Sequence, residues 1–168
     1  MSAPRRYDLV LALYPNTRGF AFVVFEGSLA PVDWSVKEIR GLQKNSRCLL
    51  AIEALLGRYT PDVVVLQDTS IDGTRRAKRV CELNASIEEL VIERGISIQA
   101  YSRAQVRETF SRFGVASKYS IAESIAKHVP AFERYLPPPR KLWMSEDARM
   151  CLFDAAALAM TFFQTPDA

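Results

Sequence analysis

Asp154 is the acidic residue with the most unusual surroundings in this 168-residue sequence. It lies in an otherwise apolar segment, Phe153–Leu158, where a carboxylate is costly to bury without a partner. We therefore expect Asp154 to be either a residue of a functional site or an ordinary capped or salt-bridged carboxylate. Two further acids have similar alternatives. Asp147 is expected in the first turn of a helix, where it favours the helix dipole, and Asp68 lies in a turn-forming sequence.

Basic residues form a cluster after the predicted strand Val63–Leu66, at the end where open α/β sheets place their sites. This cluster consists of Arg75, Arg76, Lys78 and Arg79. Four cations within five residues suit contacts with nucleic-acid phosphates, and the solvated start of a helix is the ordinary alternative. Further basic residues follow, namely Arg103, Arg107, Arg112 and Lys118. The net charge of +3 permits nucleic-acid binding but does not by itself indicate it.

Histidine and cysteine chemistry is almost excluded by the composition. His128 is the single histidine, and the three cysteines are far apart, so neither a zinc site nor a histidine-based triad is expected. We expect reduced cysteines in a cytoplasmic protein. No apolar run approaches the roughly 18 residues that span a membrane, and the N-terminus leads into a strand-like run rather than a signal-peptide core. Membrane binding and secretion are therefore not expected.

Strands are expected to position these residues. Two apolar runs and one alternating run, separated by short turns, indicate an antiparallel meander; they are Tyr7–Tyr14, Phe20–Glu26 and Val32–Ile39, with the first turn at Pro15–Gly19. Two later apolar runs, Val63–Leu66 and Ile96–Tyr101, are separated by segments with helical spacing. Because strands joined through a helix run parallel, we predict a mixed five-stranded sheet of order 3-2-1-4-5.

Helices are predicted wherever apolar residues recur at helical spacing. The expected helices are one around Cys48–Leu56 with Gly57 as its stop, Val80–Arg94, a short helix capped by Ser102, Ser117–His128, and a last helix capped by Ser145 and running to about Phe163. The last helix would place Asp147 and Asp154 on one face, roughly 10 Å apart along its axis. The sequence thus predicts a single α/β domain over residues 1–168, with helices on both faces of the sheet.

Five short motifs occur in a particular order along the chain. They are Leu13–Gly19 at the first strand, Tyr59–Gln67 around the fourth strand, Tyr101–Arg107 after the fifth, Phe113–Ala122, and Asp154–Ala159 in the last helix. Together they resemble the motifs of the RuvC-like Holliday junction resolvases, which belong to the ribonuclease H-like superfamily. The resemblance implies the same sheet order that the succession of elements predicts.

The resemblance also implies two Mg²⁺ or Mn²⁺ ions that support phosphodiester hydrolysis. In the family, the ligands are an Asp ending the first strand, a Glu ending the fourth, and one or two Asp on the last helix. Here the first two positions hold Tyr14 and Gln67, and neither supplies an anionic ligand near neutral pH. At the last-helix position, Asp154 is acidic, as the resemblance implies. Asp68 and Asp147 are the other candidate metal ligands and catalytic residues, so the expected acidic site is partly lost.

The sequence leaves three functional hypotheses open. The first is a nucleic-acid-acting protein resembling a crossover junction endodeoxyribonuclease, with branched or duplex DNA favoured over RNA and a homodimer implied by the resemblance. Its nucleic-acid contacts would come from the basic cluster with Arg107 and Lys118, while Tyr14 and Gln67 either pack or contact a base or sugar. The second is a catalytically inactive nucleic-acid-binding or scaffolding domain on the same fold. The third is a protein-interaction module that uses Pro137–Trp143, a segment that fits a lid, a partner surface or a tether.

Overall fold

The computed structural model describes residues 9–70, 77–115 and 117–165. Three strands come first, β1 (Val10–Asn16), β2 (Gly19–Phe25) and β3 (Pro31–Glu38). Helix α1 (Lys44–Tyr59) leads to β4 (Val63–Gln67), and α2 (Lys78–Glu93) leads to β5 (Ser97–Tyr101). The rest is helical, with α3 (Arg103–Ser111), α4 (Lys118–His128), the 3₁₀ helix η1 (Pro130–Tyr135) and α5 (Met150–Gln164).

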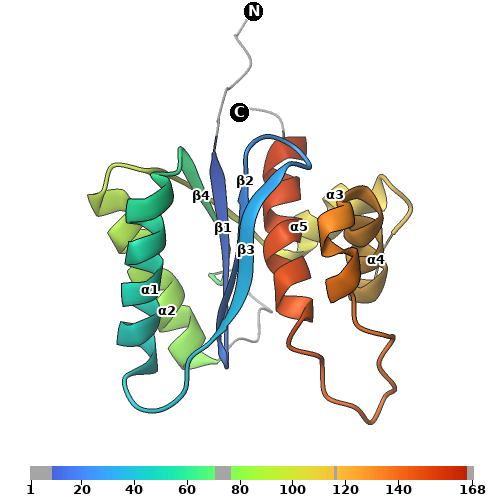
Figure 1. Cartoon of the computed structure of the whole chain (residues 1–168), viewed down its shortest axis with the longest axis horizontal. Coiled ribbons are helices and arrows are strands. Elements are labelled where there is room, and N and C mark those ends of the chain that lie inside the picture. Colours follow the sequence, from blue (N-terminus) through green and yellow to red (C-terminus); the bar gives the residue numbers. More distant parts are fainter. Residues whose placement is uncertain (1–8, 71–76, 116, 166–168) are drawn as a thin grey trace, which may run out of the picture.

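The sheet has the order β3-β2-β1-β4-β5, which confirms the predicted order. β1 pairs antiparallel with β2 and parallel with β4, and β4 pairs parallel with β5. The two parallel pairs follow from helical crossovers, because a strand can run parallel to its neighbour only after the chain returns along the sheet. The carboxyl ends of β1 and β4 consequently lie at the same edge of the sheet (Figure 1).

Helices cover both faces of the sheet, as the sequence predicts (Figure 1). Alternate residues of β1 point to opposite faces. Leu11 and Leu13 belong to the core shared with α1 and α2, whereas Val10 and Ala12 belong to the core shared with α4 and α5. Both sides are fully apolar, which explains why β1 reads as a continuous hydrophobic run rather than an alternating one.

The first turn is shorter than the sequence predicts. β1 continues through Pro15 to Asn16, so only Thr17 and Arg18 connect it to β2. The side-chain Oδ1 of Asn16 accepts hydrogen bonds from the backbone N–H groups of Arg18 (2.8 Å) and Gly19 (3.1 Å). A side chain at Gly19 would collide with the carbonyl oxygen of Lys37, so glycine is required where β2 approaches β3. Tyr14 therefore lies inside a paired strand.

The last helix begins later than predicted. Ser145 is not its N-cap, and Glu146 and Asp147 precede the helix instead of forming its first turn, because α5 starts at Met150. The reason is a turn in which the N–H of Met150 donates to the carbonyl oxygen of Asp147 (3.0 Å). The predicted placement of Asp147 and Asp154 on one helical face is therefore wrong.

Other predicted boundaries shift as well. α1 begins at Lys44, and Gly57 lies within it; the helix ends at Tyr59, followed by Thr60 in the left-handed conformation. The η1 helix was not predicted, and positions 7 and 8 of the predicted first strand lie outside the described residues. Among the described helices, none combines the length and the apolar character that crossing a membrane requires.

Candidate functional site

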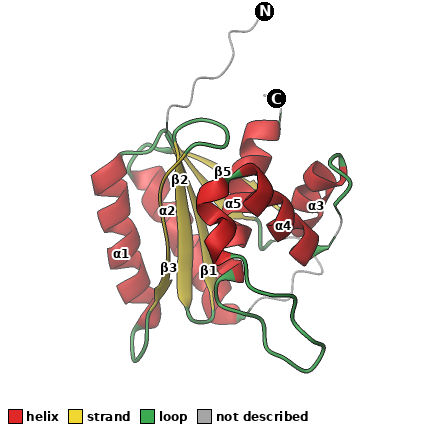
Figure 2. Ribbon diagram, turned by 45° about the vertical axis from the view of Figure 1, so that its right-hand side comes forward, coloured by secondary structure: helices red, strands yellow, loops and turns green. Residues whose placement is uncertain are grey.

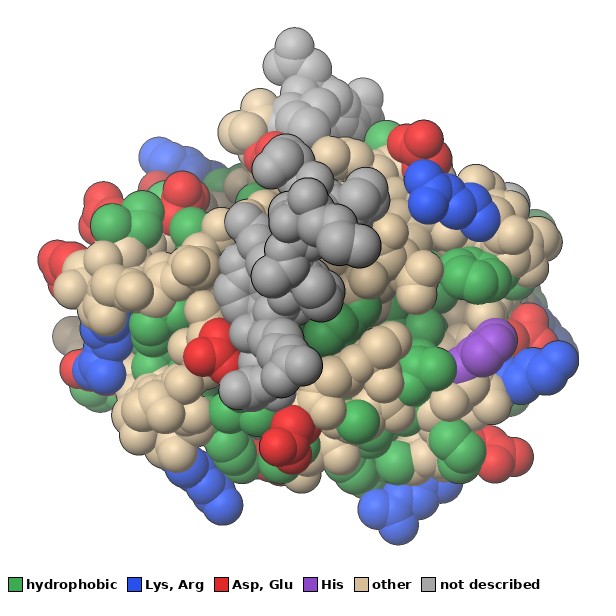
Figure 3. Space-filling model, turned by 90° about the horizontal axis from the view of Figure 1, so that it is seen from above, with side chains coloured by type: hydrophobic (Ala, Val, Ile, Leu, Met, Phe, Trp, Pro, Cys, Tyr) green, Lys and Arg blue, Asp and Glu red, His purple; other side chains and the backbone are tan. Residues whose placement is uncertain are grey.

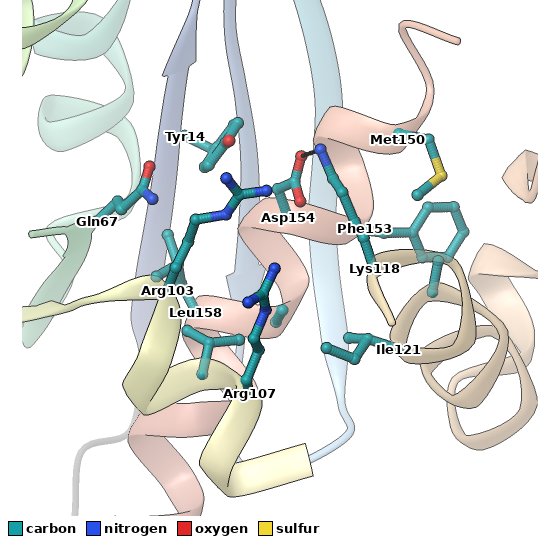
Figure 4. A pocket seen from close by; sticks show the side chains of 13 residues that line it. Tyr14, Gln67, Arg103, Arg107, Lys118, Ile121, Met150, Phe153, Asp154 and Leu158 are labelled. Carbon is teal, nitrogen blue, oxygen red and sulfur yellow. Dashed lines mark ion pairs between the residues drawn. The ribbon is translucent and has the colours of Figure 1, made fainter. Parts of the chain in front are cut away.

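A pocket opens where β1 and β4 end, between the sheet and helices α3, α4 and α5 (Figure 4). Its volume, including the open mouth, is about 600 Å³. Apolar side chains of α3, α4 and α5 form part of its lining. The polar residues that line it are Tyr14, Gln67, Arg103, Arg107, Lys118 and Asp154. The pocket thus combines three cations with a phenol, an amide and one carboxylate.

The register of the parallel strands brings Tyr14 and Gln67 into the pocket together. Ala12 on β1 and Val65 on β4 are Cα partners, and both face α5. Tyr14 and Gln67 each lie two residues further along, so they point to the same face of the sheet. The buried Gln67 also fixes its strand end, because its carbonyl oxygen accepts a hydrogen bond from Nδ2 of Asn84 on α2 (2.9 Å).

Two capping boxes place the basic residues. Ser102 accepts a hydrogen bond from the N–H of Gln105 (3.2 Å), and Gln105 Oε1 accepts one from the N–H of Ser102 (2.8 Å). α3 therefore starts at Arg103 and presents Arg107 one turn later on the same face. Ser117 and Ser120 form the corresponding pair at α4, which makes Lys118 the first helical residue. Figure 4 shows these three cations directed toward the pocket.

Lys118 forms ion pairs with two carboxylates. Its Nζ lies 2.5 Å from Oε1 of Glu146 and 3.3 Å from Oδ2 of Asp154. Burial by itself would lower the pKa of Lys118, but the charges of Asp154 and Glu146 outweigh this and raise the pKa above its ordinary value. Lys118 is therefore a permanent ammonium at neutral pH. Asp154 is thus a salt-bridged carboxylate, which is one of the two alternatives expected from the sequence, and it also lines the pocket.

The other two candidate acids make different contacts. Asp147 binds Arg149 through both carboxylate oxygens, with distances of 2.9 Å to Nε and 2.7 Å to a terminal guanidinium nitrogen. These side-chain hydrogen bonds lower the pKa of Asp147 to about 2. Asp68 accepts hydrogen bonds from the N–H (2.9 Å) and hydroxyl (2.6 Å) of Ser70, which is the turn predicted as its ordinary role. A second, adjoining pocket shares Tyr14, Lys118 and Asp154 with the first. Asp147 lines this adjoining pocket, whereas Asp68 lines neither.

The residues of the basic cluster differ in their surroundings. Arg75 and Arg76 lie outside the described residues. Lys78 is exposed at the start of α2, and its Nζ lies 3.8 Å from Glu82. Arg79 is tied into the fold, because its guanidinium donates to Asn45 Oδ1 (2.7 Å) and to the carbonyl oxygens of Asn16 (3.0 Å) and Thr17 (3.1 Å). Arg79 thus joins the β1–β2 turn to α1.

The described residues do not fit the pair of divalent ions that the family resemblance implies. Across residues 9–70, 77–115 and 117–165, no group of three or more His, Cys, Asp or Glu side chains is arranged to hold a metal ion. Mg²⁺ requires several oxygen ligands. Tyr14 and Gln67 are neutral, and the ammonium of Lys118 lies 3.3 Å from Asp154, where it would repel a second cation.

Two residues near the pocket were not predicted as site residues. Cys151 lies three residues before Asp154 on α5 and borders the adjoining pocket with Tyr14 and Lys118. The i,i+3 spacing from Asp154 is a sequence signal that could have identified it. Glu146 reaches Lys118 from a loop, and no periodicity in the sequence could have indicated that contact.

Comparisons with known proteins find similarity in structure alone. No family model and no curated protein sequence matches the chain. RuvC of Thermus thermophilus superimposes with a TM-score of 0.63 at 20% identity, covering 91% of this chain and 92% of that one. The yeast mitochondrial Holliday junction resolvase Ydc2 gives 0.60 at 13% identity, covering 92% and 78%. The fowlpox virus resolvase, in complex with Holliday junction DNA, gives 0.51 at 11% identity, covering 92% and 97%. This chain therefore has the RuvC-like form of the ribonuclease H-like fold.

Proposed function

We propose that the protein binds branched or duplex DNA at the pocket beside β1 and β4, without metal-dependent hydrolysis of the backbone. The observation that carries this proposal is that neutral and basic side chains predominate where the family resemblance implies a cluster of carboxylates. Neutral Tyr14 and Gln67 occupy the strand ends, Lys118 neutralises Asp154, and Arg103 and Arg107 face the same pocket. A site of this composition attracts an anion and offers little to a divalent cation.

The three cations of the pocket have different roles in the proposed binding of phosphate groups. The planar guanidinium groups of Arg103 and Arg107 can each bind a phosphate through two parallel hydrogen bonds. Both residues are exposed at the pocket mouth on one face of α3, so successive phosphates of one strand can reach them. Lys118 is held deeper by its two carboxylates, and it orders the pocket instead of supplying a free charge.

Tyr14 and Gln67 give the pocket hydrogen-bonding groups that a metal centre would not need. A phenol and a primary amide both donate and accept hydrogen bonds. Such groups match a sugar or a base edge better than they match an ion. We infer that these side chains contact the nucleoside portion of a strand whose phosphates bind Arg103 and Arg107.

Branched DNA is the first ligand to test, because two similar structures, a second one of RuvC from Thermus thermophilus and that of the fowlpox virus resolvase, are complexes with Holliday junctions. The opposite end of the molecule makes a useful contrast. Where it is visible, basic and acidic side chains are dispersed over it and do not gather into one patch (Figure 3). Among the described residues, the pocket end is therefore the better candidate surface for binding.

The test is fluorescence anisotropy with a labelled four-way junction, a duplex of the same sequence and a matched RNA. Arg107→Ala should weaken binding and reduce the slope of log affinity against log salt by about one. Arg58→Ala is the matched control, because Arg58 is exposed in the last turn of α1, on the other face of the sheet. If the unaltered protein binds none of the three nucleic acids at low salt, the proposal is wrong.

Hydrolysis is tested in the same samples after Mg²⁺ or Mn²⁺ is added. We expect intact DNA. Metal-dependent cleavage that disappears in Asp154→Asn would contradict the non-catalytic part of the proposal. It would support instead the nuclease hypothesis, in which Asp154, Asp147 and Asp68 are metal ligands.

A further inference from the structure

The loop between η1 and α5 exposes two large apolar side chains at its tip. Leu142 and Trp143 have relative exposures of 107% and 78%. The N–H of Met144 donates to the carbonyl oxygen of Lys141 (3.0 Å), so Leu142 and Trp143 occupy the two corner positions of a tight turn. Such a turn holds both side chains outward, away from the core.

The loop is anchored at both of its ends. On the side of η1, the hydroxyl of Tyr119 donates to the carbonyl oxygen of Pro137 (2.8 Å), which is the first of three consecutive prolines. On the side of α5, the Asp147–Arg149 pair closes a turn. Consecutive prolines favour an extended, stiff backbone. The tip is thus presented on a structured stem.

Cations flank the apolar tip. Nζ of Lys141 lies 5.7 Å from the centre of the Trp143 ring, and Arg140 approaches the carbonyl oxygen of Met144 at 3.5 Å. An aromatic ring beside two cations can stack on a base while the cations contact the neighbouring phosphates. A purely apolar protein partner would leave both charges without a complement.

The loop is continuous with the candidate site. Its stem, Pro137–Arg140, lines a pocket together with Lys118, Glu146 and Asp147, and Lys118 also lines the pocket of Tyr14 and Gln67. Figures 1 and 2 show the loop extending at the edge of the sheet where β1 ends. Lys118 thus connects the pocket that holds Arg103 and Arg107 to the stem that carries the tip.

We propose that Leu142 and Trp143 stack on unpaired or unstacked bases of the nucleic acid held at the pocket. This inference rests on the proposed function and names the part of the ligand that the site distinguishes. A continuous duplex keeps its bases stacked, whereas a branch point or a single strand exposes their faces. Stacking at the tip would therefore favour branched or single-stranded over duplex nucleic acid.

The test uses Trp143 as its own reporter. The chain has two tryptophans, and the half-buried Trp34 packs edge-on against Phe132 (5.2 Å between ring centres). In a Trp34→Phe background, addition of a four-way junction should quench the emission of Trp143, because a base stacked on the ring quenches it. Addition of the matched duplex should quench it far less.

Affinity is measured in parallel by anisotropy. Trp143→Ala should weaken junction binding about 5- to 150-fold, the range that loss of one base–aromatic stack gives, with little change for duplex. Trp143→Phe should largely restore junction binding. Leu50→Ala is the matched control, because Leu50 is an exposed leucine on α1. The affinity of this variant for the junction should equal that of the unaltered protein.

The outcomes separate the two proposals. Junction binding by Trp143→Ala equal to that of the unaltered protein, without quenching, overturns the stacking inference and leaves the proposed function standing. Failure of the unaltered protein to bind any nucleic acid overturns both. A Trp143→Ala protein that sediments as a smaller species while binding the junction normally also overturns the inference, and assigns the tip to contact between copies of the chain.

Discussion

Tyr14 and Gln67 face helix α5 from neighbouring parallel strands, each two residues beyond the Cα partners Ala12 and Val65. Asp154 on α5 lines the same pocket. These three positions are those at which the family resemblance expects carboxylates. The geometry that would support an acidic cluster is thus present, and the side-chain types at two of the three positions are not acidic.

Replacing the neutral pair should therefore create a metal site. We expect Tyr14→Asp combined with Gln67→Glu to bind Mn²⁺, because three carboxylates would then share the pocket and supply oxygen ligands. Isothermal titration with Mn²⁺ measures this. Tyr14→Asn combined with Gln67→Glu is the control with one acid fewer. The expectation fails if the paired variant shows no more Mn²⁺ binding than the unaltered protein.

Removing the ammonium of Lys118 should destabilise the fold. In Lys118→Met, the carboxylate of Asp154, whose side chain is 16% exposed, would lose the ion pair with Lys118; we expect a loss of about 1–3 kcal/mol in the free energy of unfolding. Urea denaturation measures it. Lys127→Met, an exposed position on the same helix, should change stability by less than about 0.5 kcal/mol. Equal losses in the two variants would contradict the assignment.

The pH dependence of this contribution follows from the raised pKa of Lys118. A group whose pKa is raised in the folded state stabilises the protein below its unfolded pKa, and that contribution is lost as the pH rises through the folded value. The difference in stability between the unaltered protein and Lys118→Met should therefore be constant from pH 7 to 9 and shrink only in strongly alkaline solution. Denaturation curves across this range measure it. A difference that already shrinks between pH 7 and 9 would argue against a protonated Lys118.

Asp147 should show the opposite dependence. Its pKa is lowered to about 2, principally by hydrogen bonds from Arg149, so its contribution is present above the ordinary value and is lost as the pH falls toward 2. Asp147→Asn should lower stability at pH 7 by less than about 1 kcal/mol, because the pair is partly exposed and screened. The difference from the unaltered protein should shrink as the pH falls toward 2 and vanish only below it. An undiminished difference at that pH would exclude the ion pair as its source.

Replacing Arg79 should destabilise the fold, whereas replacing its neighbour Lys78 should not. Arg79→Ala removes the hydrogen bonds that join the β1–β2 turn to α1, and we expect a loss of about 1–3 kcal/mol in unfolding free energy. Lys78→Ala, next to it in the chain and exposed, should leave stability within about 0.5 kcal/mol. Thermal or urea denaturation compares the two. Unchanged stability in Arg79→Ala would mean that the turn holds without it.

The sheet could be predicted from the sequence because each of its signals is local. Apolar runs, the change to helical spacing near Cys48 and the alternation of strands with helices determine the order 3-2-1-4-5, and Ser102 is a cap that the sequence identifies correctly. The start of the last helix was wrong because Ser145 has the residue type of a cap, whereas Asp147 closes a turn that delays the helix to Met150.

The site was predicted less completely because its contacts are distant in sequence. Lys118 and Asp154 lie on different helices, and Glu146 reaches Lys118 from a loop. No spacing rule relates such residues. Arg79 was grouped with its basic neighbours by composition, whereas its hydrogen bonds go to backbone and amide groups of two other segments. The residue type indicates the charge of a side chain, but it does not indicate which groups accept its hydrogen bonds.

Lys118 gives the pocket a counter-ion that is covalently part of the chain. A bound magnesium ion dissociates, and its occupancy follows the free ion concentration and the presence of chelators or competing metals. An ammonium held by Glu146 and Asp154 is present in every molecule at a ratio of one to one. The positive charge that Lys118 contributes is consequently independent of the metal supply around the protein.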